Sequence, residues 1–201
     1  MNQGNRVDGV RVSHPLFQEG GGGATPTSTL CLDVQPISIE RACELNLLWH
    51  SRLPKIEASN VLRNKDYVCY RAESAGVIYA VAIWSSPVAR LLNDGGTLEL
   101  RRFAIAPDAP KNTGSRVLAV MARLIAKSKP HIRRLVSYQD ESVHRGTIYA
   151  AAGWFKAGSR RGGEWSCKSR PRAAAQANAP KVRWEKLIVG PDAGTSPASV
   201  G

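Results

Sequence analysis

The sequence LELRRFAIAPDAPKNTGSRVLAVMARLI, residues 98–125, contains a strand pattern and a helix pattern joined by a short connection. Apolar and polar side chains alternate at the start of 98–105, as in a β-strand. A stretch with two prolines and several polar residues, 107–113, ends the strand, and apolar side chains then recur at helical spacing over 117–125. A strand that leads into an amphipathic helix predicts a layered α/β domain.

The rest of the chain alternates strand and helix patterns in an order that indicates the fold class. We expect further helices at 38–50 and 145–152, and further strands at 30–34, 67–72, 77–84, 132–138, 154–157 and 182–189. The strands at 67–72 and 77–84 flank a short turn, so they should form a hairpin. The order resembles the GNAT acyltransferase fold, an α/β (α+β) architecture in which a mixed, mostly antiparallel sheet carries helices on both faces.

Length and composition indicate one folded domain with a polar segment at each end. With 201 residues, 43% of them hydrophobic, the chain can form one core but not two ordinary ones. Residues 1–28 and 190–201 are rich in small and polar side chains, so we expect a flexible arm and a flexible tail around a catalytic domain at 29–189. Neither a membrane span nor a secretory signal is evident, so a cytoplasmic protein with no membrane partner is expected.

The chain is strongly basic, with a net charge of +12 and an isoelectric point near 10.0. Such an excess attracts polyanions, although a basic surface that only keeps the chain soluble would give the same charge. Tryptophans are interleaved with basic side chains near the C-terminus, a pattern that suits phosphate contacts and stacking on unpaired bases. The candidate nucleic-acid contacts in this segment are Arg160, Arg161, Lys168, Arg170, Arg172 and Arg183.

The cysteines lack the spacing of a metal site. They are Cys31, Cys43, Cys69 and Cys167, with no CxxC pair and no histidine at zinc spacing. We therefore expect free, buried thiols and no metal ion.

Two basic side chains are candidates for catalysis. His50 follows the first helix, where it could act as a general base near neutral pH or simply bind the free carbonyls of the helix end. Strand alternation places Arg102 on the same face as Leu98, Leu100 and Ala104, where a guanidinium needs an acceptor. That acceptor could be a phosphate or base of a substrate, or a carboxylate of the protein itself.

The connection that precedes the second long helix could bind an anion. Free amides at a helix N-terminus attract anions, and Gly114 would let a ligand approach closely. GNAT acyltransferases hold the pyrophosphate of acyl-CoA at this position with a glycine-rich loop, whereas this sequence has one glycine followed by Ser115. An ordinary capped helix would account for the same residues. The candidate donor-binding residues are Lys111, Asn112, Gly114 and Ser115.

Further polar side chains follow the strand at 132–138. Asp140, His144 and Tyr149 lie in one turn–helix unit at the carboxyl end of a strand, where ligands bind in α/β sheets. Asp140 could orient or deprotonate an amine, and Tyr149 could protonate a leaving group. The alternative is structural, with Asp140 capping the helix and Tyr149 packed beneath it.

These strings together resemble the Mom family of bacteriophage DNA-modification proteins. The resemblance covers about 49–158, with a weaker match at 182–184. Its most specific part is VSYxD at 136–140 followed by HxGTIYxA at 144–151 and Trp154; the shorter strings are WHSxLP at 49–54, ELRR at 99–102 and KNxxS at 111–115.

The resemblance implies a GNAT-like enzyme that converts adenine in phage DNA to its N6-carbamoylmethyl form, which protects the DNA from host restriction. By motif it assigns catalysis to His50, Arg102, Asp140 and Tyr149, with Arg102 preferred to Arg101 for the arginine of the ELRR string, and it also carries over Ser115. Arg101 and His144 join the nucleic-acid contacts. The implied partners are double-stranded DNA and a small-group donor, for which acetyl-CoA or a related acyl donor is expected, and the assembly could be a homodimer.

Two other functions fit the same sequence. One is an acyl-CoA-dependent N-acyltransferase that acts on a small amine or a protein, which would bind acyl-CoA irrespective of DNA. The other is a non-catalytic nucleic-acid-binding protein, whose salt-dependent DNA binding would not depend on Asp140 or Tyr149.

Overall fold

Nine strands form one mixed sheet in the computed structural model, which describes residues 6–7, 10–12, 26–49, 54–143, 145–160 and 180–188. The strands are β1 (Arg6–Val7), β2 (Val10–Val12), β3 (Asp33–Pro36), β4 (Tyr67–Ser74), β5 (Val77–Ser85), β6 (Thr97–Ile105), β7 (Arg134–Asp140), β8 (Phe155–Arg160) and β9 (Lys181–Leu187). The main path through the sheet is β1-β2-β5-β6-β7-β9-β8, and β3 and β4 extend it beside β5. Only the β2–β5 and β6–β7 pairs are parallel among the described strands.

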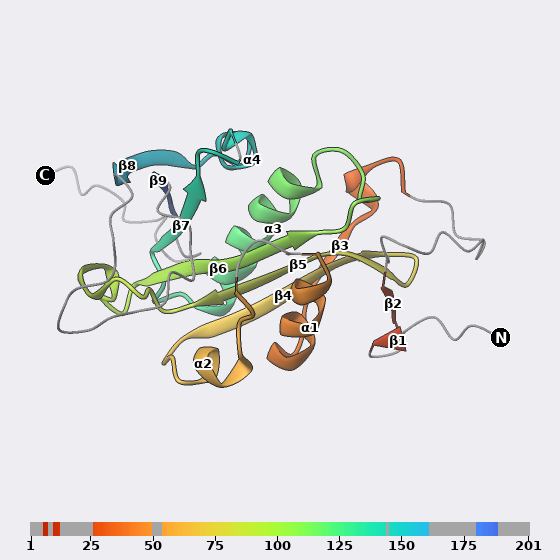
Figure 1. Cartoon of the computed structure of the whole chain (residues 1–201), viewed down its shortest axis with the longest axis horizontal. Coiled ribbons are helices and arrows are strands. Elements are labelled where there is room, and N and C mark those ends of the chain that lie inside the picture. The colour runs from red at the N-terminus through yellow and green to blue at the C-terminus, as the bar shows by residue number, and fades with distance from the viewer. Residues whose placement is uncertain are drawn as a thin grey trace, which may run out of the picture.

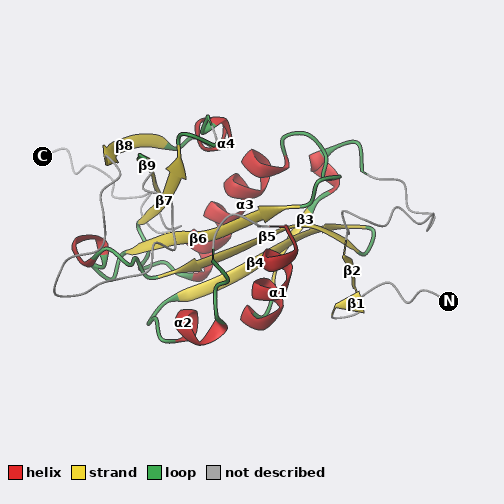
Figure 2. Ribbon diagram, in the orientation of Figure 1, coloured by secondary structure: helices red, strands yellow, loops and turns green. Residues whose placement is uncertain are grey.

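The helices cover both faces of this sheet (Figures 1 and 2). They are α1 (Ile39–Trp49), α2 (Ala58–Leu62), α3 (Thr113–Ser128) and α4 (Thr147–Ala151), with 3-10 turns η1 (Thr29–Cys31) and η2 (Arg90–Leu92). One core lies between the sheet and α3 and α4, and a smaller core lies under α1. The faces of the sheet are therefore named here the α3 face and the α1 face.

The apolar stripe of α3 fixes this helix on its face of the sheet. Leu118, Met121 and Ile125 are fully buried, as their spacing of three and four residues requires. Burial of each such side chain contributes about 1.5–3 kcal/mol. On the opposite face, Ser38 caps α1, and its Oγ accepts a hydrogen bond from the N–H of Arg41 (3.4 Å).

A β-bulge interrupts β6 at the residues that the sequence marks as chemically interesting. Ile83 pairs with Arg102 while the next residue of β5, Trp84, pairs with Leu100, so Arg101 is the extra residue. Leu98 and Leu100 face the α3 core. The expected alternation is therefore wrong beyond Leu100, because the bulge turns the side chain of Arg102 to the α1 face.

The two central parallel strands separate soon after this bulge begins. Thr97–Leu100 of β6 pairs with Arg134–Ser137 of β7, and no pairing between these two strands is present beyond the Leu100–Ser137 pair. Figure 1 shows β7 leaving β6 at an angle and rising towards α4. We call this point of separation the fork. It lies at the carboxyl ends of two parallel strands, where α/β sheets commonly bind ligands.

Most expected elements are confirmed, with shifted ends. The hairpin, the strands that became β6, β7, β8 and β9, and the helices α1, α3 and α4 all lie where their patterns predict. The strand expected at 30–34 instead begins at Asp33, after η1. The sequence patterns did not indicate α2, nor β1 and β2, which lie within the segment expected to be an arm.

Two further expectations concern thiols and membranes. Cys43 and Cys69 are free and buried as expected, but Cys31 is exposed, because it ends η1 at the surface; Cys167 lies outside the described residues. Burial raises the pKa of Cys69 to about 12, with the charges of Cys43 and Glu40 adding to the effect. No described helix combines the length and apolar character that a membrane span requires.

Candidate functional site

Tyr149 brings a hydroxyl group to the fork. Its hydroxyl and that of Ser137 are hydrogen-bonded at 2.9 Å, and Ser137 belongs to the last pair between β6 and β7. Tyr149 is buried, and this burial raises the pKa of its phenol against the opposing effect of the Ser137 hydrogen bond. The phenol is therefore protonated at neutral pH and can donate a proton at this point.

Buried aromatic rings hold Tyr149 in position. Its ring stacks on Trp184 with centroids 5.4 Å apart and meets Trp154 edge-on at 5.6 Å, and Trp154 stacks on Trp84 at 6.2 Å. Trp184 Nε1 donates to Gln139 Oε1 at 2.6 Å. The interleaved tryptophans could have been base-stacking or core residues, and Trp154 and Trp184 are core residues. Trp165, the third of them, lies outside the described residues.

The other side of the sheet carries the two adjacent arginines of β6. Arg102 donates from Nη1 to the carbonyl of Arg101 (2.7 Å) and from Nη2 to the carbonyl of Pro54 (3.2 Å). Its buried Nε has no hydrogen-bond partner in the described part of the chain. Burial and the charge of Arg101 lower the pKa of Arg102, while Glu99 and Cys43 oppose this shift. The acceptors of Arg102 are thus backbone carbonyls, not the carboxylate considered from the sequence.

Glu99 is a candidate that the sequence analysis quoted but did not select. It is buried on the α1 face, where its Oε2 accepts the N–H of Val88 (3.0 Å) and its Oε1 lies 3.5 Å from Arg101 Nε. Arg101 also donates from Nη1 to Ser85 Oγ (3.2 Å). Burial raises the pKa of Glu99 despite the Val88 bond and the charges of Arg101, Arg102 and Lys181. A glutamate between two leucines in a central strand is the signal that could have identified it.

Asp140 ends β7 on the α1 face, opposite to Ser137 and Gln139. Its Oδ1 accepts hydrogen bonds from the backbone N–H (2.9 Å) and hydroxyl (2.5 Å) of Ser142. The carboxylate therefore stabilises the turn after β7, and the expected alternative that it caps the helix is wrong: α4 has Gly146 at its N-cap. Asp140 and Arg102 share the α1 face, and Tyr149 packs on the α3 face.

The N-terminus of α3 retains hydrogen-bond donors for an anion. Asn112 is in the left-handed conformation (φ 68°), and no described group accepts a bond from the N–H of Gly114 or Ser115. Lys111 is exposed beside them. In the next position, the buried Nε of Arg116 has no hydrogen-bond partner among the described residues. The free amides of Gly114 and Ser115, with Lys111 beside them, are donors of the kind that bind an anion at a helix N-terminus.

Gly114 itself is required by packing. A Cβ at this position would lie 2.9 Å from Ile148 Cγ2 of α4 and 3.2 Å from Ile105 Cδ1 of β6. The space beside this glycine, expected to admit a ligand, is occupied by these two side chains. An anion at the N-terminus of α3 would have to approach along the helix axis.

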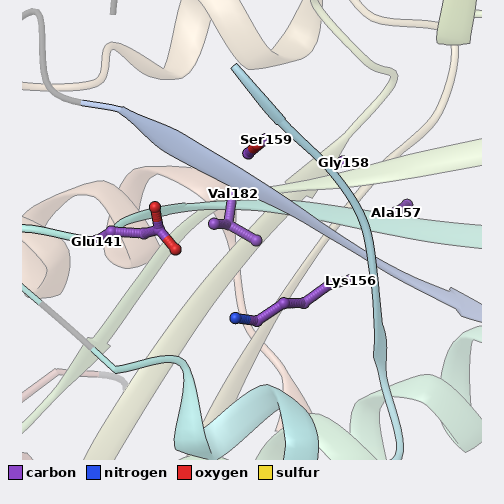
Figure 3. Close-up of a pocket in the computed structure, with 6 residues that line it drawn as sticks. All are labelled: Glu141, Lys156, Ala157, Gly158, Ser159 and Val182. Carbon is purple, nitrogen blue, oxygen red and sulfur yellow. The ribbon is translucent and has the colours of Figure 1, made fainter. Parts of the chain in front are cut away.

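A shallow groove of about 410 Å³ is lined by β8 residues 156–159, by Val182 near the start of β9 and by Glu141. Figure 3 shows Lys156 of β8 and Glu141, just after β7, extending into it from opposite sides of Val182. Lys156 Nζ also lies 5.6 Å from the centroid of the Trp184 ring, which stacks on Tyr149. Arg102, Asp140 and Tyr149 do not line this groove.

The sequence was compared with family models, curated proteins and solved structures. The model of the Mom protein family matches residues 67–178, more than half of the chain. The chain belongs to the Mom protein family. No curated protein matched the sequence.

The structural neighbours of this Mom-family chain are GNAT acetyltransferases. The ribosomal-protein-S18-alanine N-acetyltransferase from Escherichia coli is 13% identical, with a TM-score of 0.56 over 82% of this chain and 99% of its own. A GNAT-family acetyltransferase from Streptococcus pneumoniae is 13% identical (TM-score 0.54; 78% and 99% covered). An aminoglycoside acetyltransferase, AAC(6')-Ib in complex with coenzyme A and kanamycin, is 14% identical (TM-score 0.53; 78% and 94% covered). These likenesses confirm the GNAT-like fold.

The family match extends from the start of β4 to beyond β8, so it includes the fork and α4. Several expected site residues lie outside the described residues: His50, His144, Arg161, Lys168, Arg170 and Arg172. Arg160 ends β8, and Arg183 of β9 pairs with Glu185 (Nε to Oε1, 2.8 Å). No group of three potential metal-binding side chains occurs in the described part of the chain.

Proposed function

We propose that this chain is a transferase that modifies the exocyclic N6 amine of adenine in DNA, giving N6-carbamoylmethyladenine or a related N6-acyl-type adduct. Such a mark would protect the DNA from host restriction. The observation that carries the proposal is the buried hydroxyl of Tyr149 at the fork of a Mom-family protein, within hydrogen-bond distance of Ser137. A protonated phenol in a fixed position is suited to protonating a leaving group.

The chemistry requires groups on both sides of the amine. The lone pair of an adenine amine is delocalised into the ring, so the base has to leave the stack and be aligned with an electrophile. Asp140 and Glu99 are two carboxylates on the α1 face that could accept the amine proton. Arg102 could stabilise a phosphate or a developing anion on that face.

These groups lie on two faces of the sheet, so a reaction that uses all of them has to pass through the fork. There β6 and β7 no longer pair, and a substrate group on the α1 face would have to pass between them to meet the buried Tyr149 hydroxyl on the α3 face. Lys111 and the amides of Gly114 and Ser115 would hold the pyrophosphate of an acyl-CoA at the start of α3. Such a cofactor would supply an acyl group: the new bond joins N6 to the carbonyl carbon, the thioester bond breaks, and coenzyme A leaves as the thiol. This route gives the N6-acyl adduct, whereas the carbamoylmethyl form needs a donor that carries its leaving group on the CH2 carbon.

Nucleoside mass spectrometry tests the proposal. Plasmid DNA from cells that express the chain should carry a mass increment on deoxyadenosine. Tyr149→Phe keeps the buried ring but removes the hydroxyl, and we expect a loss of about 10²–10⁴-fold in the modification rate. Tyr79→Phe is the matched control, since Tyr79 is also buried but lies near the start of β5, where its carbonyl accepts the N–H of Ala106, away from the fork. Unmodified DNA from the wild-type chain, or full modification by Tyr149→Phe, would contradict the proposal.

A second function is favoured by the unbonded amides at the start of α3. An acyl-CoA-dependent N-acyltransferase that acts on a small amine or a protein needs the same donors at this position. Calorimetric titration with acetyl-CoA, with and without DNA, separates the two functions. Acetylation of a polyamine or peptide in the absence of DNA, with no altered deoxyadenosine, would favour this second function.

A further inference from the structure

Two exposed aromatic side chains lie on the α1 face where helix α1 no longer covers the sheet. Tyr138 of β7 is 36% exposed and Phe155 of β8 is 48% exposed, although both belong to strands of the central sheet. Helix α1 packs on β4, β5 and β6, on the other side of the fork. Exposed aromatic side chains that gather with cations on one sheet face form a candidate binding surface.

The strand register places these rings around one arginine. Tyr138 pairs with Arg183 of β9, and Arg183 pairs with Gly158 of β8. Phe155 pairs with Glu185, two residues along β9 on the same face. The two rings are thus separated by two strand spacings and by two residues along the strand, about 12 Å in all. A Cβ on Gly158, which pairs with Arg183, would meet no atom within 4 Å.

Two ion pairs on this face each join an arginine to a more deeply buried glutamate. The Arg183 side chain is 36% exposed while its partner Glu185 is 8% exposed, and Arg101 is likewise more exposed (22%) than its partner Glu99 (10%). In both pairs the carboxylate is more deeply buried than the guanidinium group that it contacts, and Arg183 is the more exposed of the two arginines. The outer surface therefore combines aromatic rings with cations, the combination that binds unpaired nucleotides through stacking and phosphate contacts.

We propose that Tyr138, Phe155 and Arg183, here called the stacking platform, bind an unpaired nucleotide of the DNA substrate. The proposal rests on the proposed function, because a base that is modified at N6 has to leave the duplex. Tyr138 lies one residue beyond Ser137, on the opposite face of β7. A nucleotide on the platform is consequently beside the fork, with its phosphate near Arg183 and Arg101. The platform replaces the buried tryptophans as the base-stacking surface.

Fluorescence anisotropy with a labelled single-stranded oligonucleotide tests the platform. Tyr138→Ala and Phe155→Ala should each weaken binding about 5- to 150-fold, the loss expected for one stacked base. Tyr138→Phe should retain binding, because it keeps the stacking ring. Leu47→Ala is the control, since Leu47 is an exposed apolar side chain on α1, away from the platform. Arg183→Gln should reduce the slope of log affinity against log salt by about 1.

The outcomes separate the platform from the catalytic proposal. Equal affinities for the wild-type, Tyr138→Ala and Phe155→Ala chains overturn the platform even if the DNA of expressing cells is modified. Weakened binding without any modified deoxyadenosine in the wild type supports the platform and overturns the proposed reaction. Exposed side chains contribute little to stability, so each variant should unfold at nearly the wild-type temperature. Thermal unfolding thereby verifies that a loss of DNA binding is not caused by misfolding.

Discussion

Replacement of Gly146 by alanine should disturb the side chains that pack under Tyr149, and it should lower the free energy of unfolding more than Gly76→Ala does. Gly146 is the N-cap of α4 and has a φ of 73°, in the left-handed region that favours glycine. A Cβ here would collide with Gln139 Oε1 and lie 2.6 Å from Trp184 Cζ2. These are the two side chains whose buried hydrogen bond lies under the Tyr149 ring.

The cost has two separable parts. The left-handed backbone costs an alanine about 1–2 kcal/mol. The collision adds the loss of the Trp184–Gln139 hydrogen bond, about 1–3 kcal/mol for a buried pair left unsatisfied. Gly146→Ala should therefore lower the free energy of unfolding by about 2–5 kcal/mol. Gly76→Ala is the matched control, because Gly76 has a φ of 75° and a Cβ there would meet nothing within 4 Å.

Urea unfolding monitored by tryptophan fluorescence measures both variants. We expect Gly76→Ala to show only the backbone cost and Gly146→Ala to exceed it by about 1–3 kcal/mol. Equal free energies of unfolding for the two variants would show that the Gln139–Trp184 contact does not constrain the turn. The reasoning about how Tyr149 is held would then be refuted.

Three further measurements test other parts of the structure. Burial would raise the pKa of Asp66, but hydrogen bonds and charges from Lys129 and His131 outweigh it and lower the pKa. The contribution of the Asp66 carboxylate to the free energy of unfolding is thus present above about pH 4 and is lost as the pH falls through the lowered pKa. Asp66→Asn removes this contribution, so the free energy of unfolding measured in urea should fall less steeply on the acid side. Gly114→Ala should lower the free energy of unfolding by about 1–3 kcal/mol, because the added Cβ overpacks against Ile148. In a double-mutant cycle the same substitution should cost clearly less when Ile148 is already alanine. Tyr149→Phe should lower the free energy of unfolding by about 1 kcal/mol, measured in urea, through loss of the Ser137 bond.

Periodic patterns predicted the elements of this fold because each depends on which face is buried. The α3 stripe and the β4–β5 hairpin follow directly from side-chain spacing. The bulge in β6 left no such signal, because an extra residue depends on how β5 and β6 pair across the sheet. Consequently the alternation was correct for Leu98 and Leu100 and wrong for Arg102.

The site was predicted in parts for a related reason. Sequence strings identified Tyr149 and Asp140, but not that they lie on opposite faces of β7, which depends on the direction of the chain after the strand. A tryptophan or tyrosine can be a core residue or an exposed stacking residue, and composition does not distinguish the two roles. Trp154 and Trp184 are buried because Tyr149 of α4 packs on both of their rings, whereas Tyr138 is exposed on the other face of the sheet.

One inserted residue accounts for both special features of β6. The bulge lies between Leu100 and Arg102, and the last pair between β6 and β7 also involves Leu100. Bulges bend a strand and increase its twist, so β6 turns away from β7 where Arg101 is inserted. The same insertion directs Arg101 and Arg102 to one face, each held by its own partners, Ser85 and Glu99 for the first and Pro54 for the second. The doubled arginine is therefore not a redundancy: it opens the fork and supplies the cations beside it.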